Sequence, residues 1–66
     1  MDKFPERLKD LRIDNNLTQT QLSKETGLSQ ACIAKLEKGS RTPSVDTLIA
    51  LAKFFKCTTD YLLGLE

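Results

Sequence analysis

Small, amide and basic side chains between residues 30 and 38 have the composition of a surface that contacts base edges. At 100° per residue, one side of a helix over this run carries no acid. Its members are Gln30, Ala31, Ala34, Lys35 and Lys38. A glutamine amide can pair with adenine, a lysine can donate to guanine, and alanine allows close approach to a thymine methyl. The predicted base-reading residues are Gln30, Ala31, Ala34 and Lys35.

The same side of this helix has a plainer interpretation. Small and basic residues on an exposed helix face are most often a solvated surface with no partner. On the opposite side, Cys32, Ile33 and Leu36 would pack against the rest of the domain in either case. The choice between the two interpretations therefore depends on the elements that surround this helix.

Those elements carry clear helix start and stop signals. Thr18 and Gln21 have the T-x-x-Q spacing of a capping box, and Gly27 stands where that helix should end. Ser29 is placed to cap the next helix, which runs to about residue 37 and is ended by Gly39. Two short helices joined by a turn with glycine form a helix-turn-helix, a unit that places its second helix in the major groove of DNA.

Three further helices complete the predicted fold, which is all-α. The first runs from about Pro5 to Asn15 and turns an inward stripe of Phe4, Leu8 and Leu11 to the core, while Ile13 lies off that stripe.

The last two predicted helices start at hydroxyl residues. Ser44 caps one of them, and Thr58 caps a short final helix that ends at Leu63. For the helix that Ser44 caps, the predicted inward stripe consists of Val45, Leu48, Ile49, Ala52 and Phe55.

The 66 residues form one small domain, residues 1–66, with a formal net charge of +1. Between residues 29 and 43, Lys35, Lys38 and Arg41 stand against Glu37 alone, so positive charge concentrates on and after the second helix of the predicted unit. Such local concentration, more than net charge, favours contact with nucleic acid.

Composition also argues against several other classes. The chain has no histidine, no paired-cysteine motif and no glycine-rich phosphate loop, so we expect no metal, no cofactor and no enzymatic activity. Cys32 and Cys57 are interpreted as small, half-buried residues. No apolar run is long enough to span a membrane, and the first residues lack a secretory pattern, so we expect a cytoplasmic protein.

Residues 19–38 resemble the helix-turn-helix of the phage repressor and Cro-type family, also called XRE. The matching positions are Gln19, Leu22, Gly27, Leu28, Ile33, Leu36 and Glu37. The segments TPSVDTLIALAKFF and DYLLG resemble the same family in order, so the resemblance covers essentially the whole chain. It implies a compact five-helix, lambda-repressor-like domain that binds operator DNA, commonly as a dimer.

The resemblance also implies roles for residues outside the base-reading set. The phosphate contacts that it implies are Gln19, Ser29, Lys38, Ser40, Arg41 and Thr42. Arg12 and Glu37 are implied to form an ion pair that joins the first helix to the third.

The predicted function is sequence-specific regulation of transcription, most simply repression. The partner would be double-stranded DNA, with no membrane and no small-molecule substrate. A homodimer, formed through the C-terminal segment, would place two recognition helices about 34 Å apart on an inverted-repeat operator. The alternative is a protein-interaction module of the same fold, antitoxin-like or accessory, whose apolar C-terminal segment binds a partner helix. An acid on the outward side of residues 30–38 would favour that alternative, and the sequence has none there.

Overall fold

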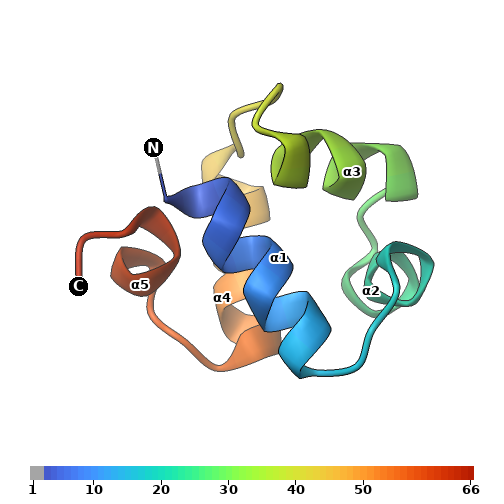
Figure 1. The fold of residues 1–66 in the computed structure, drawn as a ribbon, viewed down its shortest axis with the longest axis horizontal. Coiled ribbons are helices and arrows are strands. Elements are labelled where there is room, and N and C mark those ends of the chain that lie inside the picture. Colours follow the sequence, from blue (N-terminus) through green and yellow to red (C-terminus); the bar gives the residue numbers. More distant parts are fainter. Residues whose placement is uncertain (1–2) are drawn as a thin grey trace.

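The computed structural model describes residues 3–66, and these residues form helices joined by short turns (Figure 1). The helices are α1 (Phe4–Asp14), α2 (Gln19–Thr26), α3 (Gln30–Lys38), α4 (Val45–Phe55) and α5 (Thr59–Leu63). No strand occurs in this part of the chain, so the all-α, five-helix prediction is confirmed. None of these helices has the length and apolar character needed to cross a membrane.

Local capping chemistry sets the ends of the central helices. The hydroxyl of Thr18 accepts a hydrogen bond from the backbone N–H of Gln21 at 3.0 Å, and the Gln21 side chain accepts one from the Thr18 N–H at 2.8 Å. The predicted capping box is therefore present. Gly27 ends α2 with a φ of 79°, in the left-handed region that glycine adopts without strain. Serine and threonine hydroxyls cap α3, α4 and α5 in the same way.

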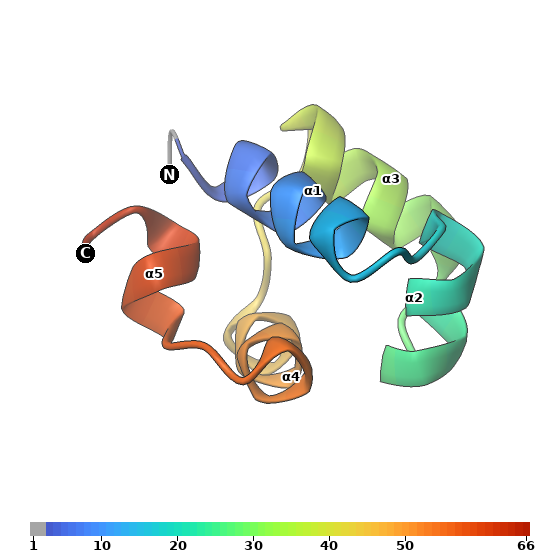
Figure 2. The ribbon, with the colours of Figure 1, turned by 60° about the horizontal axis from the view of Figure 1, so that its bottom comes forward.

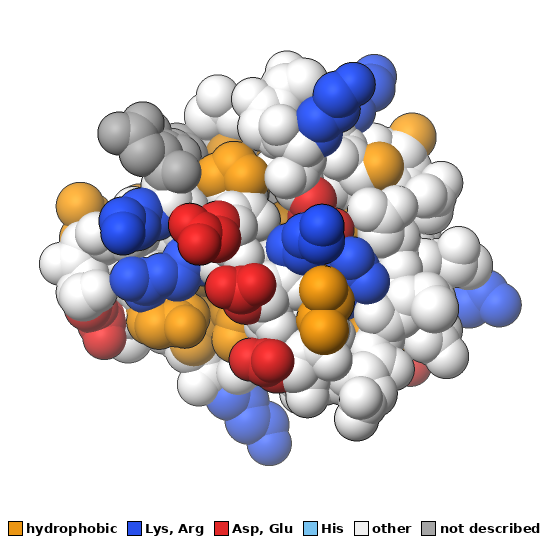
Figure 3. All heavy atoms as spheres, in the orientation of Figure 1, with side chains coloured by type: hydrophobic (Ala, Val, Ile, Leu, Met, Phe, Trp, Pro, Cys, Tyr) orange, Lys and Arg blue, Asp and Glu red, His pale blue; other side chains and the backbone are white. Residues whose placement is uncertain are grey.

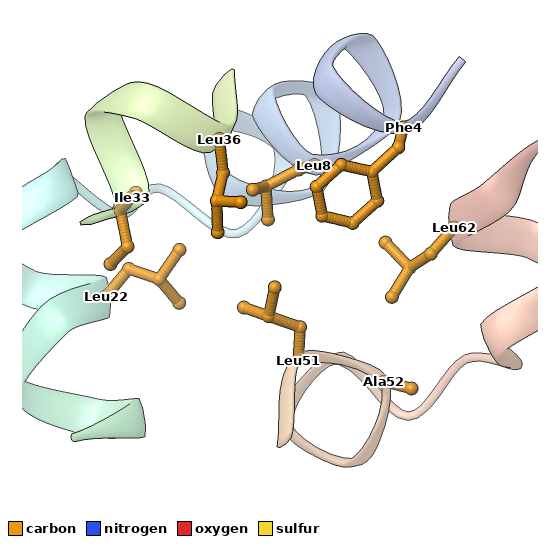
Figure 4. Close-up of a cluster of buried hydrophobic side chains, with 8 residues drawn as sticks. All are labelled: Phe4, Leu8, Leu22, Ile33, Leu36, Leu51, Ala52 and Leu62. Carbon is orange, nitrogen blue, oxygen red and sulfur yellow. The ribbon is translucent and has the colours of Figure 1, made fainter. Parts of the chain in front are cut away.

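Side chains from all five helices converge on one apolar core (Figure 4). Its members are Phe4, Leu8, Leu22, Ile33, Leu36, Leu51, Ala52 and Leu62. Helix α1 packs against α3 and α5, and α4 closes the opposite side of the core (Figures 1 and 2). Cys32 and Cys57 are half-buried free thiols beside this core, as predicted.

The inward stripe predicted for α4 is wrong at two positions. Val45 and Ile49 are 72% and 41% exposed, whereas Leu51, which lay outside the predicted stripe, is fully buried. The remaining members of the stripe lie in the core or against it. Helix α4 is apolar around most of its circumference, so helical spacing fits more than one face and does not identify the buried one.

Beside the shared apolar core, an arginine of α1 makes polar contacts with α5. The Arg7 Nη1 donates to the carbonyl oxygen of Tyr61 at 3.0 Å, and its guanidinium carbon lies 4.3 Å from the centre of the Tyr61 ring. Gly64 follows with a φ of 77°, and a Cβ there would stand 2.6 Å from the Cβ of Lys3. The end of α5 can therefore approach α1 this closely only because residue 64 has no side chain.

Candidate nucleic-acid interface

Helix α3 has one buried face and one face open to solvent. Ile33 and Leu36 are fully buried, and they hold the helix against the core. The outward residues divide into four that are exposed and one, Ala34, that is half-buried; the exposed ones are Gln30, Ala31, Lys35 and Lys38. The predicted division of this helix is confirmed, and no acid lies on its outward face.

The N-terminus of α3 carries exposed polar groups at one end of this face. Ser29 is exposed, and its hydroxyl accepts a hydrogen bond from the Cys32 N–H at 3.0 Å. This bond caps the helix and leaves the hydroxyl hydrogen of Ser29 able to donate outward. Gln30 is the next residue, so its amide stands at the end of the helix that meets base edges in helix-turn-helix proteins.

Gln30 is hydrogen-bonded to Gln19, the first residue of α2. The Gln30 Nε2 donates to the Gln19 Oε1 at 2.9 Å, and the Gln19 Nε2 donates to the Glu37 Oε1 at 3.2 Å. The sequence predicts separate roles for these two glutamines and does not indicate the bond between them. Eleven positions separate them along the chain, and only the crossing of α2 and α3 brings their amides together.

Arg12 and Glu37 form a partly buried ion pair at the inner end of this chain of bonds. The Arg12 Nε lies 2.6 Å from the Glu37 Oε2, and the Arg12 Nη2 donates to the Glu37 Oε1 at 3.0 Å. Their side chains are only 13% and 5% exposed. The Arg12 Nη1 also donates to the Leu17 carbonyl at 2.8 Å, so each guanidinium nitrogen has a partner within the domain. The hydrogen bond that Arg12 donates to Glu37 raises the pKa of Arg12 above its ordinary value, although burial acts against this rise.

The loop after α3 presents the remaining polar residues predicted for the interface. Gly39 reverses the chain with a φ of 84°, and the Ser40 N–H donates to the Lys35 carbonyl at 3.1 Å. Ser40, Arg41 and Thr42 are all exposed. The loop therefore continues the basic surface of α3 with further exposed side chains.

The outer side of α1 differs from that of α3 because it carries exposed acids among its basic side chains (Figure 3). Glu6, Asp10 and Asp14 are exposed at a spacing of four residues, and acidic side chains gather over α1 in the space-filling view (Figure 3). Such a row repels the phosphates of a nucleic acid. Among residues 3–66, the outward side of α3, with its loop and the start of α2, combines exposed small, amide and basic side chains without an acid.

Comparison with known proteins agrees with this geometry. A helix-turn-helix family model matches residues 8–62. The chain belongs to this helix-turn-helix family. Its membership confirms the predicted resemblance to the phage repressor and Cro-type proteins, because phage repressors are among its relatives. No solved structure matches the chain significantly.

Three relatives illustrate the range of this family. The HTH-type transcriptional activator BcrR of Enterococcus faecalis is 41% identical over 64 residues, which are 97% of this chain and 31% of that protein. Repressor protein C2 of Salmonella phage P22 is 34% identical over 58 residues, covering 88% of this chain and 27% of that protein. The cryptic phage CTXphi transcriptional repressor RstR of Vibrio cholerae is 31% identical over 52 residues, covering 79% of this chain and 47% of that protein. The chain spans less than half the length of each of these relatives.

Proposed function

We propose that this helix-turn-helix domain is a sequence-specific DNA-binding regulator of transcription that inserts α3 into the major groove. The observation that carries the proposal is the acid-free outward face of α3, which Ile33 and Leu36 anchor from behind. An α-helix fits the major groove of B-DNA, where each base pair presents a distinct pattern of donors and acceptors. The names of the relatives, which describe activators and repressors of transcription, support the same role.

Within that groove, each outward residue of α3 is assigned a different kind of base contact. Gln30 offers a donor and an acceptor to adenine, and Lys35 offers donors to the two acceptors of guanine. Ala31 and Ala34 let the helix approach closely and provide contact with thymine methyl groups.

A second set of residues holds the duplex through its phosphates. This set consists of Gln19, Ser29, Lys38, Ser40, Arg41 and Thr42. They surround the base-reading face from the start of α2, the start of α3 and the loop after it, which supports the assignment. Such contacts set the register of the protein on DNA and contribute affinity that depends on salt.

We further infer that the protein binds an inverted-repeat operator as a homodimer and acts as a repressor. The C-terminal segment is the proposed contact between subunits, because Leu65 follows α5 and is 73% exposed. A twofold dimer would place its recognition helices about 34 Å apart, one turn of DNA. Sedimentation of the protein with and without its selected duplex measures the stoichiometry. A reporter gene behind that operator distinguishes repression from activation.

The test of DNA binding is selection of duplexes from a random pool, followed by salt titration of the winners. We expect a motif with two related half-sites, and an affinity that falls steeply as salt concentration rises. Lys35→Ala should blur one position of the motif, whereas Lys24→Ala, which removes an exposed lysine from the far end of α2, should leave the motif unchanged. Failure to bind any duplex at low salt would refute the proposed function.

The second candidate function is a protein-interaction module, and one observation favours it. Val45 and Ile49 are exposed large apolar residues one helical turn apart on α4. Apolar residues exposed together often mark a contact with another protein. Specific capture of a partner protein by a domain that binds no duplex would support this alternative.

A further inference from the structure

The chain of hydrogen bonds from Arg12 to Gln30 has a direction that its inner end determines. Arg12 donates to both oxygens of Glu37, which marks Glu37 as an ionised carboxylate that can only accept. Glu37 is also too buried for water to replace its protein partners freely. Whatever amide lies against its Oε1 must therefore present nitrogen to it.

The same requirement determines the orientation of the two glutamine amides in turn. Gln19 turns its Nε2 to Glu37, so its Oε1 faces the other way, toward Gln30. Gln30 must then turn its own Nε2 inward to Gln19, at 2.9 Å. The outer group of the Gln30 amide is consequently its carbonyl oxygen, with one remaining N–H beside it.

The resulting order of donor and acceptor discriminates between purines. Adenine presents an N6 donor and an N7 acceptor in the major groove, which match an outward oxygen and the N–H next to it. Guanine presents two acceptors, O6 and N7, and its O6 would face the carbonyl oxygen of Gln30 without a hydrogen between them.

We propose that the Arg12–Glu37 ion pair sets the base preference of Gln30 by orienting its amide through Gln19. Neither Arg12 nor Glu37 touches DNA in this arrangement, so both are positioning residues. The inference rests on the proposed function, because it assigns a cause to the specificity of the same surface. It gives the ion pair a role in recognition in addition to its role in joining α1 to α3.

The first variant that tests this relay is Gln19→Ala. It cuts the chain of bonds but keeps the ion pair, and it alters only the first residue of α2, so the fold should survive. Thr20→Ala, at the exposed neighbouring position, is the matched control. Gln30→Ala first identifies the base position concerned. At that position we expect Gln19→Ala to lower the preference for adenine over guanine about two- to tenfold, which is the range of one neutral hydrogen bond. The ratio of bases is the readout, because loss of a phosphate contact would weaken all sequences alike.

The second variant, Glu37→Gln, should reverse the relay. The new amide keeps its oxygen on the Arg12 Nε and turns its nitrogen, in the place of Oε1, to Gln19, so the Arg12 Nη2 loses this acceptor. Gln19 then presents nitrogen to Gln30, whose NH2 group becomes the outer one. We expect preference at the same position to move from adenine toward guanine, with the other positions unchanged. A purely structural ion pair would weaken binding without changing which base is preferred.

The outcomes separate the two proposals. A wild-type protein that selects no motif overturns both the proposed function and the relay. A wild-type motif that is unchanged at the Gln30 position in Gln19→Ala overturns the relay alone, and circular dichroism establishes that the variant is folded. A motif that changes in Gln19→Ala and not in Thr20→Ala supports the orientation of Gln30 by Gln19, and a shift toward guanine in Glu37→Gln supports the role of the ion pair. An unchanged base preference in folded Glu37→Gln overturns that role.

Discussion

The helix-turn-helix and the α4–α5 pair are held in this domain by different kinds of interaction. Helices α2 and α3 are joined to each other and to α1 by charged and amide side chains as well as by apolar packing. Helices α4 and α5 depend mainly on apolar packing against the core, to which Arg7 adds a hydrogen bond and a ring contact at Tyr61.

The difference has a physical reason. Apolar contacts are non-directional, so they fix where a helix lies and leave its polar side chains free to rotate. Hydrogen bonds require particular angles, so they also fix the direction of a side chain. A surface that must present donors and acceptors in order needs the second kind of interaction, whereas α4 and α5 need only to be held in place.

The largest expected effect comes from removing the ion pair that joins α1 to the helix-turn-helix. Glu37→Ala leaves the Arg12 guanidinium buried without its carboxylate, which should cost about 3–5 kcal/mol of unfolding free energy. Urea unfolding followed by circular dichroism measures the change. Glu25→Ala, which removes an exposed acid from α2, is the matched control and should stay within about 0.5 kcal/mol of wild type. Equal losses in the two variants would mean that the ion pair contributes nothing specific.

The apolar side is tested by two residues of α4. Leu51→Ala opens a cavity in the core and should cost about 2–5 kcal/mol. Ile49→Ala removes a side chain that is 41% exposed, so its cost should be well below that of Leu51→Ala. The same urea experiment compares them. If Ile49→Ala lowered the free energy of unfolding more than Leu51→Ala, the inward face predicted from the sequence would be the correct one.

This pair of residues also shows where prediction from sequence succeeds and fails. In α3, apolar and polar residues alternate with a clear helical period, so Ile33 and Leu36 were assigned correctly to the core. In α4, the apolar residues are too many for periodicity to select a face, and Val45 and Ile49 were assigned wrongly. When a helix carries more apolar residues than its buried face can hold, helical spacing alone does not identify that face.

The helix ends were predictable because their chemistry is local. A hydroxyl, an amide three residues later and a glycine after the last turn are enough to place α2 between Thr18 and Gly27. The bond between Gln19 and Gln30 was not predictable in this way. It depends on how two helices cross, and a glutamine at either position is equally consistent with a solvated side chain.

A smaller effect sharpens the distinction within the proposed interface. Lys35→Ala should cost about 1–3 kcal/mol on the selected duplex and relax the preference at one base position. Arg41→Ala should weaken binding to all sequences alike and reduce the slope of log affinity against log salt by about one. Fluorescence anisotropy titrations of both variants at several salt concentrations provide the slopes. An altered motif in Arg41→Ala, with an unaltered one in Lys35→Ala, would invert the two roles.

The smallest expected effect concerns the junction of α4 and α5, where Cys57 lies half-buried against the core. Burial raises the pKa of this thiol, and the carboxylate of Glu66 adds to the rise. Because the folded state favours the protonated thiol, its contribution to stability is present below the ordinary thiol pKa of about 8.5 and is lost as the pH rises through the higher folded value.

We therefore expect wild type to lose more stability than Cys57→Ala between pH 8 and pH 10, as measured by the urea midpoint at each pH. All other ionisable groups are common to both proteins, so the difference between the two losses isolates the thiol. Equal losses would show that water reaches Cys57 as readily in the folded chain as in the unfolded one. The packing of the α4–α5 junction would then be looser than that of the helix-turn-helix, and apolar contact alone would not exclude solvent there.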